Sequence, residues 1–361
     1  MNKAKRFESV IISTILLTSI FSILLSASFM PDVSAVLCKP IQHSSISITS
    51  DSGFTDANGV VSGSGTASDP YIIGNLKIDD LSLGYGLKID NTSGGITKYF
   101  NIQCMQSSFS GLTSGDKLVW LVNIHQNTVI SDISGNSAEQ GATTGLEVDE
   151  SSNITMNNLS FNKMGLDGVL INDSNNITIS ESKLKAVNNG LTIQNSHDIT
   201  IGKKCNLSGP SGCNDFTYDD GRGVYILNSY NILVQYTKTT ADDTGGILVD
   251  GTGSFNVTLT NGVTSGDGSI CEHGIPTGDR VDTIAGIAII NGAHDVTISH
   301  YIANGDTHFS LMNGGDGVYI NPCTDSTESV SVTSPGGANL VVCDVSYQNE
   351  YGFIPVPTSS C

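Results

Sequence analysis

The sequence is poor in positive charge, in aromatic side chains and in proline. Of its 361 residues only 16 are Lys or Arg, against 35 Asp or Glu, which gives a formal net charge of −19 at pH 7. Contacts to nucleic-acid phosphates or to an anionic membrane surface need clustered Lys and Arg, so we expect neither as a partner. The hydrophobic content of 38% is too high for a disordered acidic chain, and the 40 Gly and 9 Pro show no three-residue period, which excludes collagen. The composition predicts many short strands and turns.

Long apolar runs are missing, with one exception at the N-terminus. Lys3, Lys5 and Arg6 precede an apolar stretch over residues 10–30, and the small residues at 33–35 form a cleavage pattern. Residues 1–35 are therefore predicted to be a signal peptide, and the protein to be secreted or held at the cell surface. The alternative is an uncleaved N-terminal anchor, because the run is about as long as a membrane span. Membrane contact is expected only through this segment.

The sequence contains no C-x-x-C motif, although it has eight cysteines, all after residue 35. An even set of cysteines in an exported chain is typical of a disulfide-bonded protein in an oxidising compartment. Cys205 and Cys213 lie in one short insertion and make the easiest pair, while the other six cannot be paired from sequence. The only close Cys/His combination, Cys271 with His273, is too sparse for a zinc or copper site.

A repeat organises almost the whole chain. The segment GVLINDSNNITI (residues 168–179) recurs in register as GLTIQNSHDITI (190–201) and as GVYILNSYNILV (223–234). The shortest intervals between equivalent Asn or Asp residues define a unit of about 22 residues, and the longer intervals are this unit plus an insertion. Looser copies begin at Gly86, Gly145, Gly246, Gly286 and Gly317.

Each repeat holds short runs in which every second residue is apolar, such as Val169 with Ile171 and Ile177 with Ile179. This alternation predicts strands with one face inward, and no helix fits it. β-Branched residues at the same offset in every unit would form columns if the units coiled on one another. A leucine-rich repeat would need a Leu and Asn/Cys signature that is absent. We therefore predict an all-β fold, a parallel β-helix with three short strands per coil and about nine coils.

The Asn before each Ile-Thr-Ile strand has a structural explanation. Its amide can bond the equivalent side chain one rung away, and Asn tolerates the left-handed backbone of a tight turn. Several of these residues also begin N-x-S/T sequons, which permit glycosylation in an exported protein. For Asn153, Asn176 and Asn256 we favour a ladder over glycosylation, and Asn206, in an insertion, is the better acceptor. The other sequons begin at Asn91, Asn158 and Asn172.

The repeats resemble the right-handed parallel β-helix repeats of the pectin-lyase-like superfamily, in particular those of the NosD-like group of periplasmic copper-processing and carbohydrate-binding proteins. The segment GSGTASDPYII (63–73) is also similar to the start of many exported archaeal β-helix proteins of that group. The resemblance covers residues 45–335 and implies a single-stranded right-handed β-helix. It implies no single activity, since the superfamily includes lyases, hydrolases, epimerases and non-catalytic binding proteins.

The predicted organisation places the signal peptide at residues 1–35, an N-terminal cap at 36–80, the β-helix at 81–333 and a C-terminal cap at 334–361. The insertions, at 202–222, 262–285 and 303–316, all follow the same strand of the coil. We expect them to gather along one edge, where solenoids usually build their binding surface.

Acidic residues in and near these insertions share one register of the repeat, each four or three residues before its glycine. They are Asp219 and Asp220, Asp242 and Asp243, and Asp282. Carboxylates one rung apart, about 4.8 Å, do not all ionise cheaply. Either a cation such as calcium lies between them, or some pKa values rise, as in the acid of a glycoside hydrolase. A third reading is that these residues only cap turns.

The candidate catalytic set is therefore Asp219, Asp220, Asp242, Asp243 and Arg222, and the candidate calcium ligands are the same four aspartates with Asp282. Arg222 stands beside the first pair, where a lyase would need its base. The order of acidic pairs, a histidine and an arginine is loosely similar to polygalacturonase-type hydrolases. However, His273 follows Glu272 rather than Gly, and no Lys follows Arg280 as that motif requires.

Four functional hypotheses follow. We favour a protein that binds an extracellular or cell-surface polysaccharide or glycan through its loop edge, with calcium as the expected cofactor. The alternatives are a carbohydrate-active enzyme, either a polysaccharide lyase or a glycoside hydrolase, a NosD-like copper-processing protein, and a purely structural surface protein. Copper(I) prefers Met, Cys and His, and the 6 Met and 7 His of this chain form no dense cluster.

Overall fold

The protein is described by a computed structural model that covers residues 38–109, 115–141, 143–185, 188–203, 214–217, 221–240, 245–265, 285–290, 293–299, 302–304, 318–319, 342–343 and 346–348. The chain divides into two compact units, Met1–Cys38 and Lys39–Cys361, and the fold below is that of the second. The predicted signal peptide and most of the predicted C-terminal cap lie outside the described residues. Within the described part, no helix is long and apolar enough to cross a membrane.

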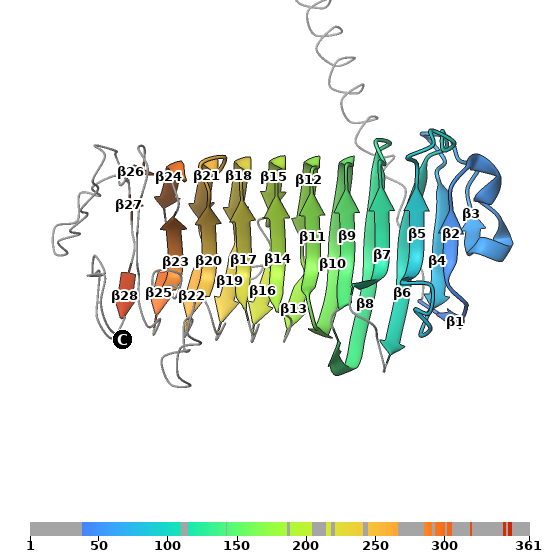
Figure 1. The fold of residues 1–361 in the computed structure, drawn as a ribbon, viewed down its shortest axis with the longest axis horizontal. Coiled ribbons are helices and arrows are strands. Elements are labelled where there is room, and N and C mark those ends of the chain that lie inside the picture. The colour runs from blue at the N-terminus through green and yellow to red at the C-terminus, as the bar shows by residue number, and fades with distance from the viewer. Residues whose placement is uncertain are drawn as a thin grey trace, which may run out of the picture. The chain divides into compact units, whose positions relative to one another are not determined.

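One side of the coil is a nine-stranded sheet in which every pair of neighbours is parallel (Figure 1). Successive strands are in register, so that Val169 lies between Leu146 and Leu191. The strands are β2 (Ile46–Ile48), β5 (Tyr85–Asp90), β7 (Asp116–Val122), β9 (Thr143–Asp149), β11 (Asp167–Asn172), β14 (Asn189–Gln194), β17 (Arg222–Leu227), β20 (Gly245–Asp250) and β23 (Ala285–Ile290).

The other two sides belong to one 19-stranded sheet that runs as two ladders from β10. The first ladder joins β10 (Ser152–Met164), β12 (Asn175–Ser180), β15 (His197–Ile201), β18 (Tyr230–Gln235), β21 (Phe255–Thr260) and β24 (His294–Ser299). The second joins β10 to β13 (Lys183–Lys185), β16 (Asn214–Thr217), β19 (Thr237–Thr240), β22 (Val263–Ser265) and β25 (Ile302–Asn304).

The earlier coils use longer strands. β4 (Tyr71–Lys77), β6 (Phe100–Phe109) and β8 (Thr128–Gly141) pair in sequence with β10, and β8 lies along both halves of β10 in place of two short strands. The remaining elements are β1 (Ile41–Gln42), β3 (Val60–Ser62), β26 (Val318–Tyr319), β27 (Val342–Cys343), β28 (Ser346–Gln348) and two short 3-10 helices, η1 (Asp51–Gly53) and η2 (Asp56–Asn58).

Parallel pairing of three strands per coil confirms the predicted all-β class and the parallel β-helix. The number of regular turns differs from the prediction. About six turns run from β9 to β25, whereas nine or so were predicted for residues 81–333. Before β9, the long strands leave no separate third strand in the coil.

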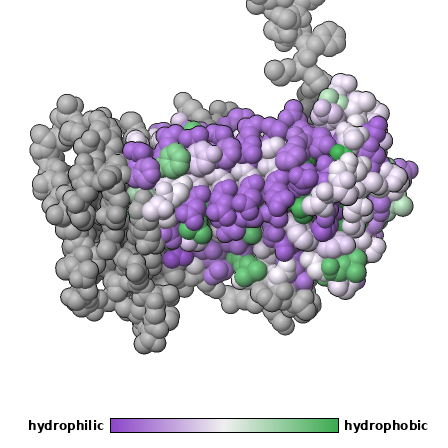
Figure 2. All heavy atoms as spheres, turned by 45° about the horizontal axis from the view of Figure 1, so that its top comes forward, coloured by the Kyte–Doolittle hydropathy of each residue, from purple (hydrophilic) through white to green (hydrophobic). Residues whose placement is uncertain are grey.

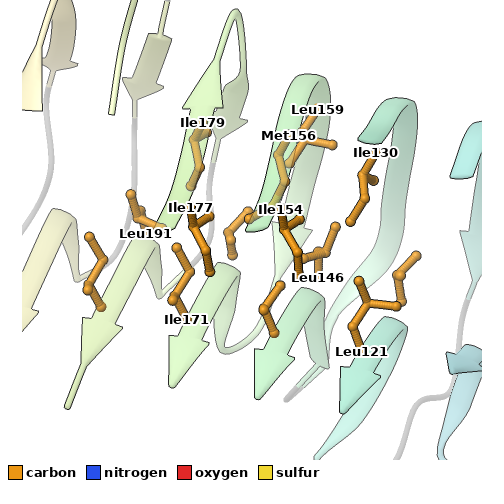
Figure 3. Close-up of a cluster of buried hydrophobic side chains, with 14 of the residues drawn as sticks. Leu121, Ile130, Leu146, Ile154, Met156, Leu159, Ile171, Ile177, Ile179 and Leu191 are labelled. Carbon is orange, nitrogen blue, oxygen red and sulfur yellow. The ribbon is translucent and has the colours of Figure 1, made fainter. Parts of the chain in front are cut away.

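The core is a set of apolar columns that run through the centre of the coil (Figure 3). Val169, Ile171, Ile177 and Ile179, predicted to face inward, are each at most 1% exposed. Figure 3 shows Ile171 of the nine-stranded sheet and Ile177 of the opposite ladder in the same interior. Burial of such a side chain is worth roughly 1.5–3 kcal/mol, and each coil supplies several.

The predicted asparagine ladder is present at the turn between the two sheets. Asn176 Nδ2 donates to Asn153 Oδ1 (2.6 Å), and Asn256 Nδ2 donates to Asn231 Oδ1 (2.7 Å). Between these pairs Asn231 Nδ2 donates to Asp198 Oδ1 (3.0 Å). Their φ angles lie between 52° and 61°, the left-handed region that Asn and Asp tolerate best among non-glycine residues.

A second ladder, which the sequence analysis did not predict, lies inside the same turn. Each serine in it is at most 2% exposed. Four of the five accept the backbone N–H of the serine one rung before, at 2.9–3.2 Å, and the first, Ser151, accepts that of Ile124 at 2.9 Å. Each hydroxyl also donates to a backbone carbonyl a few residues earlier in its own coil. The members are Ser151, Ser174, Ser196, Ser229 and Ser254.

The cysteines agree with the prediction of an oxidised protein where they are described. Cys38 and Cys104 are both disulfide-bonded. The predicted pair of Cys205 and Cys213 lies outside the described residues.

Candidate functional site

Most of the residues predicted to form the site lie outside the described part of the chain. These are Asp219, Asp220, Asp242, Asp243 and Asp282, together with Glu272, His273 and Arg280 of the hydrolase-like pattern. The calcium ligand set and the loop edge therefore stay predictions. Arg222 is described, and it lies on the nine-stranded sheet.

Arg222 is the first residue of β17, and it lies between Asn189 and Gly245 in the ladder. Its guanidinium lies 5.2 Å from the ring centre of Tyr225, a cation–π contact. The Tyr225 hydroxyl donates to Asp250 Oδ2 at 3.0 Å. Burial, with the negative charge of Asp250 adding, raises the pKa of Tyr225 to about 12, so this phenol is a hydrogen-bond donor at neutral pH and not a ready base.

The outward side chains of this sheet form a column in which each rung carries a different residue. The ladder register places Lys88, Trp120, Glu147, Leu170, Thr192 and Tyr225 beside one another in this order. Successive parallel strands lie about 4.8 Å apart, so the column offers a new chemical group at every such step.

Two carboxyl groups on neighbouring rungs have raised pKa values. Burial raises the pKa of Glu147 on β9 more than the nearby positive charge of Lys117 lowers it, and Asp149 and Asp167 raise it further. The Lys117 Nζ lies 3.4 Å from Glu147 Oε2. Together these groups form a half-buried cluster in which a carboxyl group keeps its proton to a higher pH than in water.

Asp167, on β11, is the second member of the pair. Burial raises its pKa although two neighbours donate hydrogen bonds to Oδ1, the Thr192 hydroxyl at 2.5 Å and the Asn189 amide at 3.0 Å. Strongly perturbed carboxyl groups are one mark of a functional site, although structural networks produce them as well.

Trp120 lies on the rung before Glu147 and carries a cation on its ring. Lys88 Nζ is 4.1 Å and Lys117 Nζ is 4.7 Å from the ring centre. The indole Nε1 is buried and has no hydrogen-bond partner among the described residues. The region from Lys88 to Asp167 thus gathers two ammonium groups, one indole and two perturbed carboxyl groups. We call Lys88, Lys117, Trp120, Glu147 and Asp167 the Glu147 strip.

The row beside the strip on the same face is a polar ladder. Asn172 Nδ2 donates to Asp149 Oδ1 (2.6 Å), and Gln194 Nε2 donates to Asn172 Oδ1 (2.7 Å). These groups are mutually bonded, which fixes their orientation, and Asn172 Nδ2 also donates to Asp173 Oδ2 at 2.9 Å.

A stack of four rings runs next to the asparagine ladder on the first ladder of the other sheet. His197, Tyr230, Phe255 and His294 lie one rung apart, with ring centres separated by 4.8, 4.8 and 5.4 Å and planes within 12° of parallel. The inner ring faces cover each other, so this stack presents edges to solvent and is a poor platform for a sugar ring.

The histidine at each end of the ring stack contacts the aspartate that follows it in the sequence. His197 Nδ1 lies 2.8 Å from Asp198 Oδ2, and His294 Nδ1 lies 2.9 Å from Asp295 Oδ2. The hydrogen bond from His197, with that of Asn231, holds the pKa of Asp198 below its usual value. No group of three or more His, Cys, Asp or Glu with metal-binding geometry occurs among the described residues.

Few large apolar side chains lie on the described surface. The face seen in Figure 2 is mostly hydrophilic, with hydrophobic residues scattered on it. The large apolar side chains that are exposed in the described ranges are Ile41, Val61, Leu83 and Val129.

The sequence analysis missed Glu147 and Asp167 because it searched the insertions for acidic residues in register. One signal was present: Asp167 directly precedes Gly168, at the offset that Asn189 and Arg222 occupy in their own repeats. The residue before the repeat glycine therefore changes from one coil to the next, while the glycine itself stays.

The chain was compared with known proteins in three ways. Among curated proteins, none matches the sequence. Solved structures to which the chain is similar include the alginate lyase from Paenibacillus sp. str. FPU-7, at 10% identity and a TM-score of 0.47 over 84% of this chain and 98% of that one. The exopolygalacturonase from Thermotoga maritima has 13% identity and a TM-score of 0.35, over 74% of this chain and 77% of that one.

A mutant of the periplasmic alginate epimerase AlgG has 15% identity and a TM-score of 0.46, over 84% of this chain and 67% of that one. A family profile described as the right handed beta helix region matches residues 120–324, more than half of the sequence. With the parallel coils and the recurring 22-residue unit, this match shows that the chain belongs to the right-handed β-helix family.

Proposed function

We propose that this protein binds an extracellular or cell-surface polysaccharide on the outer face of its nine-stranded sheet, at the Glu147 strip. The observation that carries the proposal is the pair of carboxyl groups with raised pKa values, Glu147 and Asp167, on neighbouring rungs beside Lys117. The proposal includes export of the chain by its N-terminal segment.

The chemistry of the strip suits a ligand that is rich in hydroxyl groups. A carboxyl group accepts hydrogen bonds when ionised and also donates one when protonated, and ammonium groups donate. The ring of Trp120 is partly covered by two lysines, so hydrogen bonds would contribute more than ring stacking. Because neighbouring rungs of the strip carry different polar or aromatic side chains, a polymer chain laid along it meets a new contact at each step of about 4.8 Å.

Calcium is the proposed cofactor for one class of ligand. A net charge of −19 opposes an acidic polysaccharide unless a cation bridges the two, and Asp219, Asp220, Asp242, Asp243 and Asp282 are the proposed ligands of that cation. Hard carboxylate oxygens are the donors that calcium prefers. Binding of uronic-acid polymers should therefore require calcium, whereas binding of neutral polymers should not.

A binding assay with matched variants tests this function. We would measure the affinity of the purified mature protein for a panel of neutral and uronic-acid polysaccharides, with calcium and with a chelator. Glu147→Gln and Lys117→Gln should weaken binding about tenfold or more, since a hydrogen bond to a charged group is worth about 1.5–3 kcal/mol. Glu181→Gln and Lys183→Gln, which change exposed residues away from the strip, serve as controls and should bind as the wild type.

Two outcomes of this binding assay would contradict the proposal. Wild-type binding that both strip variants retain would show that the strip is the wrong surface. Failure of the wild type to bind any polysaccharide in the panel would overturn the proposed function and favour a structural surface protein.

The second candidate is a carbohydrate-active enzyme, and the raised pKa values of Glu147 and Asp167 are the observation that favours it. Glycoside hydrolysis needs a carboxyl group that is still protonated near neutral pH beside one that is ionised. Incubation of the same panel, followed by assays for new reducing ends and for the unsaturated product of a lyase, separates this candidate from a binding protein. An enzyme that uses the pair would lose turnover in Glu147→Gln and Asp167→Asn while its Tm stayed near that of the wild type.

The NosD-like resemblance leaves copper processing as a further alternative. Stoichiometric copper that stays with the mature protein through dialysis would favour it. Absence of such copper, together with polysaccharide binding, would leave the proposal above.

A further inference from the structure

Six N-x-S/T sequons begin within the described residues, and the structure separates one of them from the rest. The six begin at Asn91, Asn153, Asn158, Asn172, Asn176 and Asn256. In all but the first, the side-chain amide nitrogen that would carry a glycan is already used to bond a neighbouring rung.

The five engaged amides donate across one rung at 2.6–2.9 Å. Asn153 donates to the His125 carbonyl and Asn158 to Asp132, whereas Asn172 donates to Asp149. Asn176 and Asn256 donate to the preceding members of the asparagine ladder. A glycan on any of these nitrogens would replace one of its two N–H groups and would have to lie beside the neighbouring rung that the amide bonds.

Asn91 lies instead in the turn that follows β5. Its Oδ1 accepts the backbone N–H of Ile96 at 2.8 Å, and its backbone carbonyl accepts the N–H of Gly94, also at 2.8 Å. The Oδ1 bond fixes the amide, and its Nδ2 donates to none of the described residues. Asn91 is partly exposed, and Thr92, Ser93 and Gly94 are exposed.

The sequon hydroxyl is accessible as well. Ser93 is exposed, whereas the hydroxyl residues of the ladder sequons, such as Thr178, lie within strands that are hydrogen-bonded on both sides. A turn can enter the active site of a modifying enzyme, whereas a central strand of a sheet cannot leave its ladder without breaking it.

We propose that Asn91 is an N-glycosylation site of the exported chain. In the reaction the Asn91 amide nitrogen forms a bond to the anomeric carbon of a glycosyl group carried on a phosphate or diphosphate. The bond between this carbon and the carrier oxygen breaks, the carrier leaves as its anion, and the amide loses one proton. The donor and the transferase belong to the secretory pathway of the producing cell.

Glycopeptide mass spectrometry tests the proposal. The full chain is produced in a host whose secretory pathway glycosylates a control glycoprotein, and only the exported fraction is analysed. Ser93→Ala removes the sequon but leaves Asn91 and its bond to Ile96 in place. Thr178→Ala removes the Asn176 sequon in the same way and is the matched control.

We expect a glycan on the Asn91 peptide of the exported wild type and its loss in Ser93→Ala. In Thr178→Ala the Asn91 peptide should keep its glycan, and the only mass change should be that of the substitution itself. An exported wild type with an unmodified Asn91, or with occupancy at Asn176 equal to or above that at Asn91, would overturn the proposal. A Tm near that of the wild type for each variant shows that loss of the glycan does not result from misfolding.

Discussion

The turn between the two sheets and the outer face of the nine-stranded sheet obey opposite rules. At the turn each coil supplies the same residues, a buried serine and then an exposed Asn or Asp, as in Ser196 with Asp198 and Ser229 with Asn231. On the outer face successive rungs carry unlike residues, such as Lys88, Trp120 and Glu147. At the turn a hydrogen bond passes from rung to rung, so each coil supplies the same or a similar residue there. On the outer face, even rungs that are hydrogen-bonded to each other carry unlike side chains, as Gln194 and Asn172 do. Variation within a repeat therefore marks where this protein is free to carry function.

The largest expected effect comes from a side chain in the apolar interior of the coil, where the same residue types recur in every repeat. Ile171→Ala should lower the free energy of unfolding by about 2–5 kcal/mol, because it opens a cavity in a column where the side chain is fully buried. The outward neighbour Leu170, which is only half-buried, provides the control, and Leu170→Ala should cost clearly less. Urea denaturation followed by circular dichroism measures both. Equal losses would mean that the two faces of β11 are not distinct.

The serine ladder should show the next largest effect. Ser196→Ala leaves the buried N–H of Ser174 without its acceptor and removes the donor to the Gln194 carbonyl. A buried group that loses its partner costs about 1–3 kcal/mol. Ser160→Ala changes an exposed serine on β10 and should stay within about 0.5 kcal/mol of the wild type. If thermal unfolding ranked the two variants equally, the turn would not depend on its hydroxyl groups.

The smallest expected effect is a dependence of stability on pH, which differs in sign between the outer face and the turn. The pKa of Asp167 is raised in the folded protein, so its ionised form destabilises the fold at neutral pH. Stability should increase as the pH falls through that raised pKa toward the unfolded value of about 3.9. The pKa of Asp198 is lowered, so its contribution is present above the unfolded value of about 3.9 and is lost as the pH falls through the folded one.

Melting temperatures between pH 7 and pH 3 separate the two groups. Asp167→Asn should reduce the gain in Tm between neutral and mildly acidic pH, whereas Asp198→Asn should reduce the loss below about pH 4. The same curve for Asp167→Asn and the wild type would mean that the carboxyl group of Asp167 is not perturbed.

The repeat alone was sufficient to predict the fold class, the inward residues of the strands and the asparagine ladder. Val169 and Ile171 could be placed because alternation with a period of two has one solution on a half-buried strand. Asn176 could be placed because its offset before the strand calls for a left-handed turn residue. The serine two residues earlier stands in the same repeats, but a small polar residue near a turn is expected to be exposed until its burial is known.

The candidate site was less accessible to prediction. Arg222 was predicted and lies on the outer face of the nine-stranded sheet, but Glu147 and Asp167 were not singled out. They are 20 residues apart in the sequence and belong to different strands, and neither falls in an insertion. What makes them unusual is burial beside another charge, and burial is a property of the packed coils rather than of the residue type.

The sequence by itself determined that this chain forms a coil of parallel strands, because each repeat has too little apolar surface to fold alone and the same residues recur where stacking would bring them together. The tertiary structure decided which polar groups are used up and which are available. Hydrogen bonds between rungs connect atoms about 22 or more residues apart, so only the stacked coils show that Asn176 bonds Asn153, that Glu147 lies among Lys117, Asp149 and Asp167, and that the amide nitrogen of Asn91 stays unbonded among the described residues.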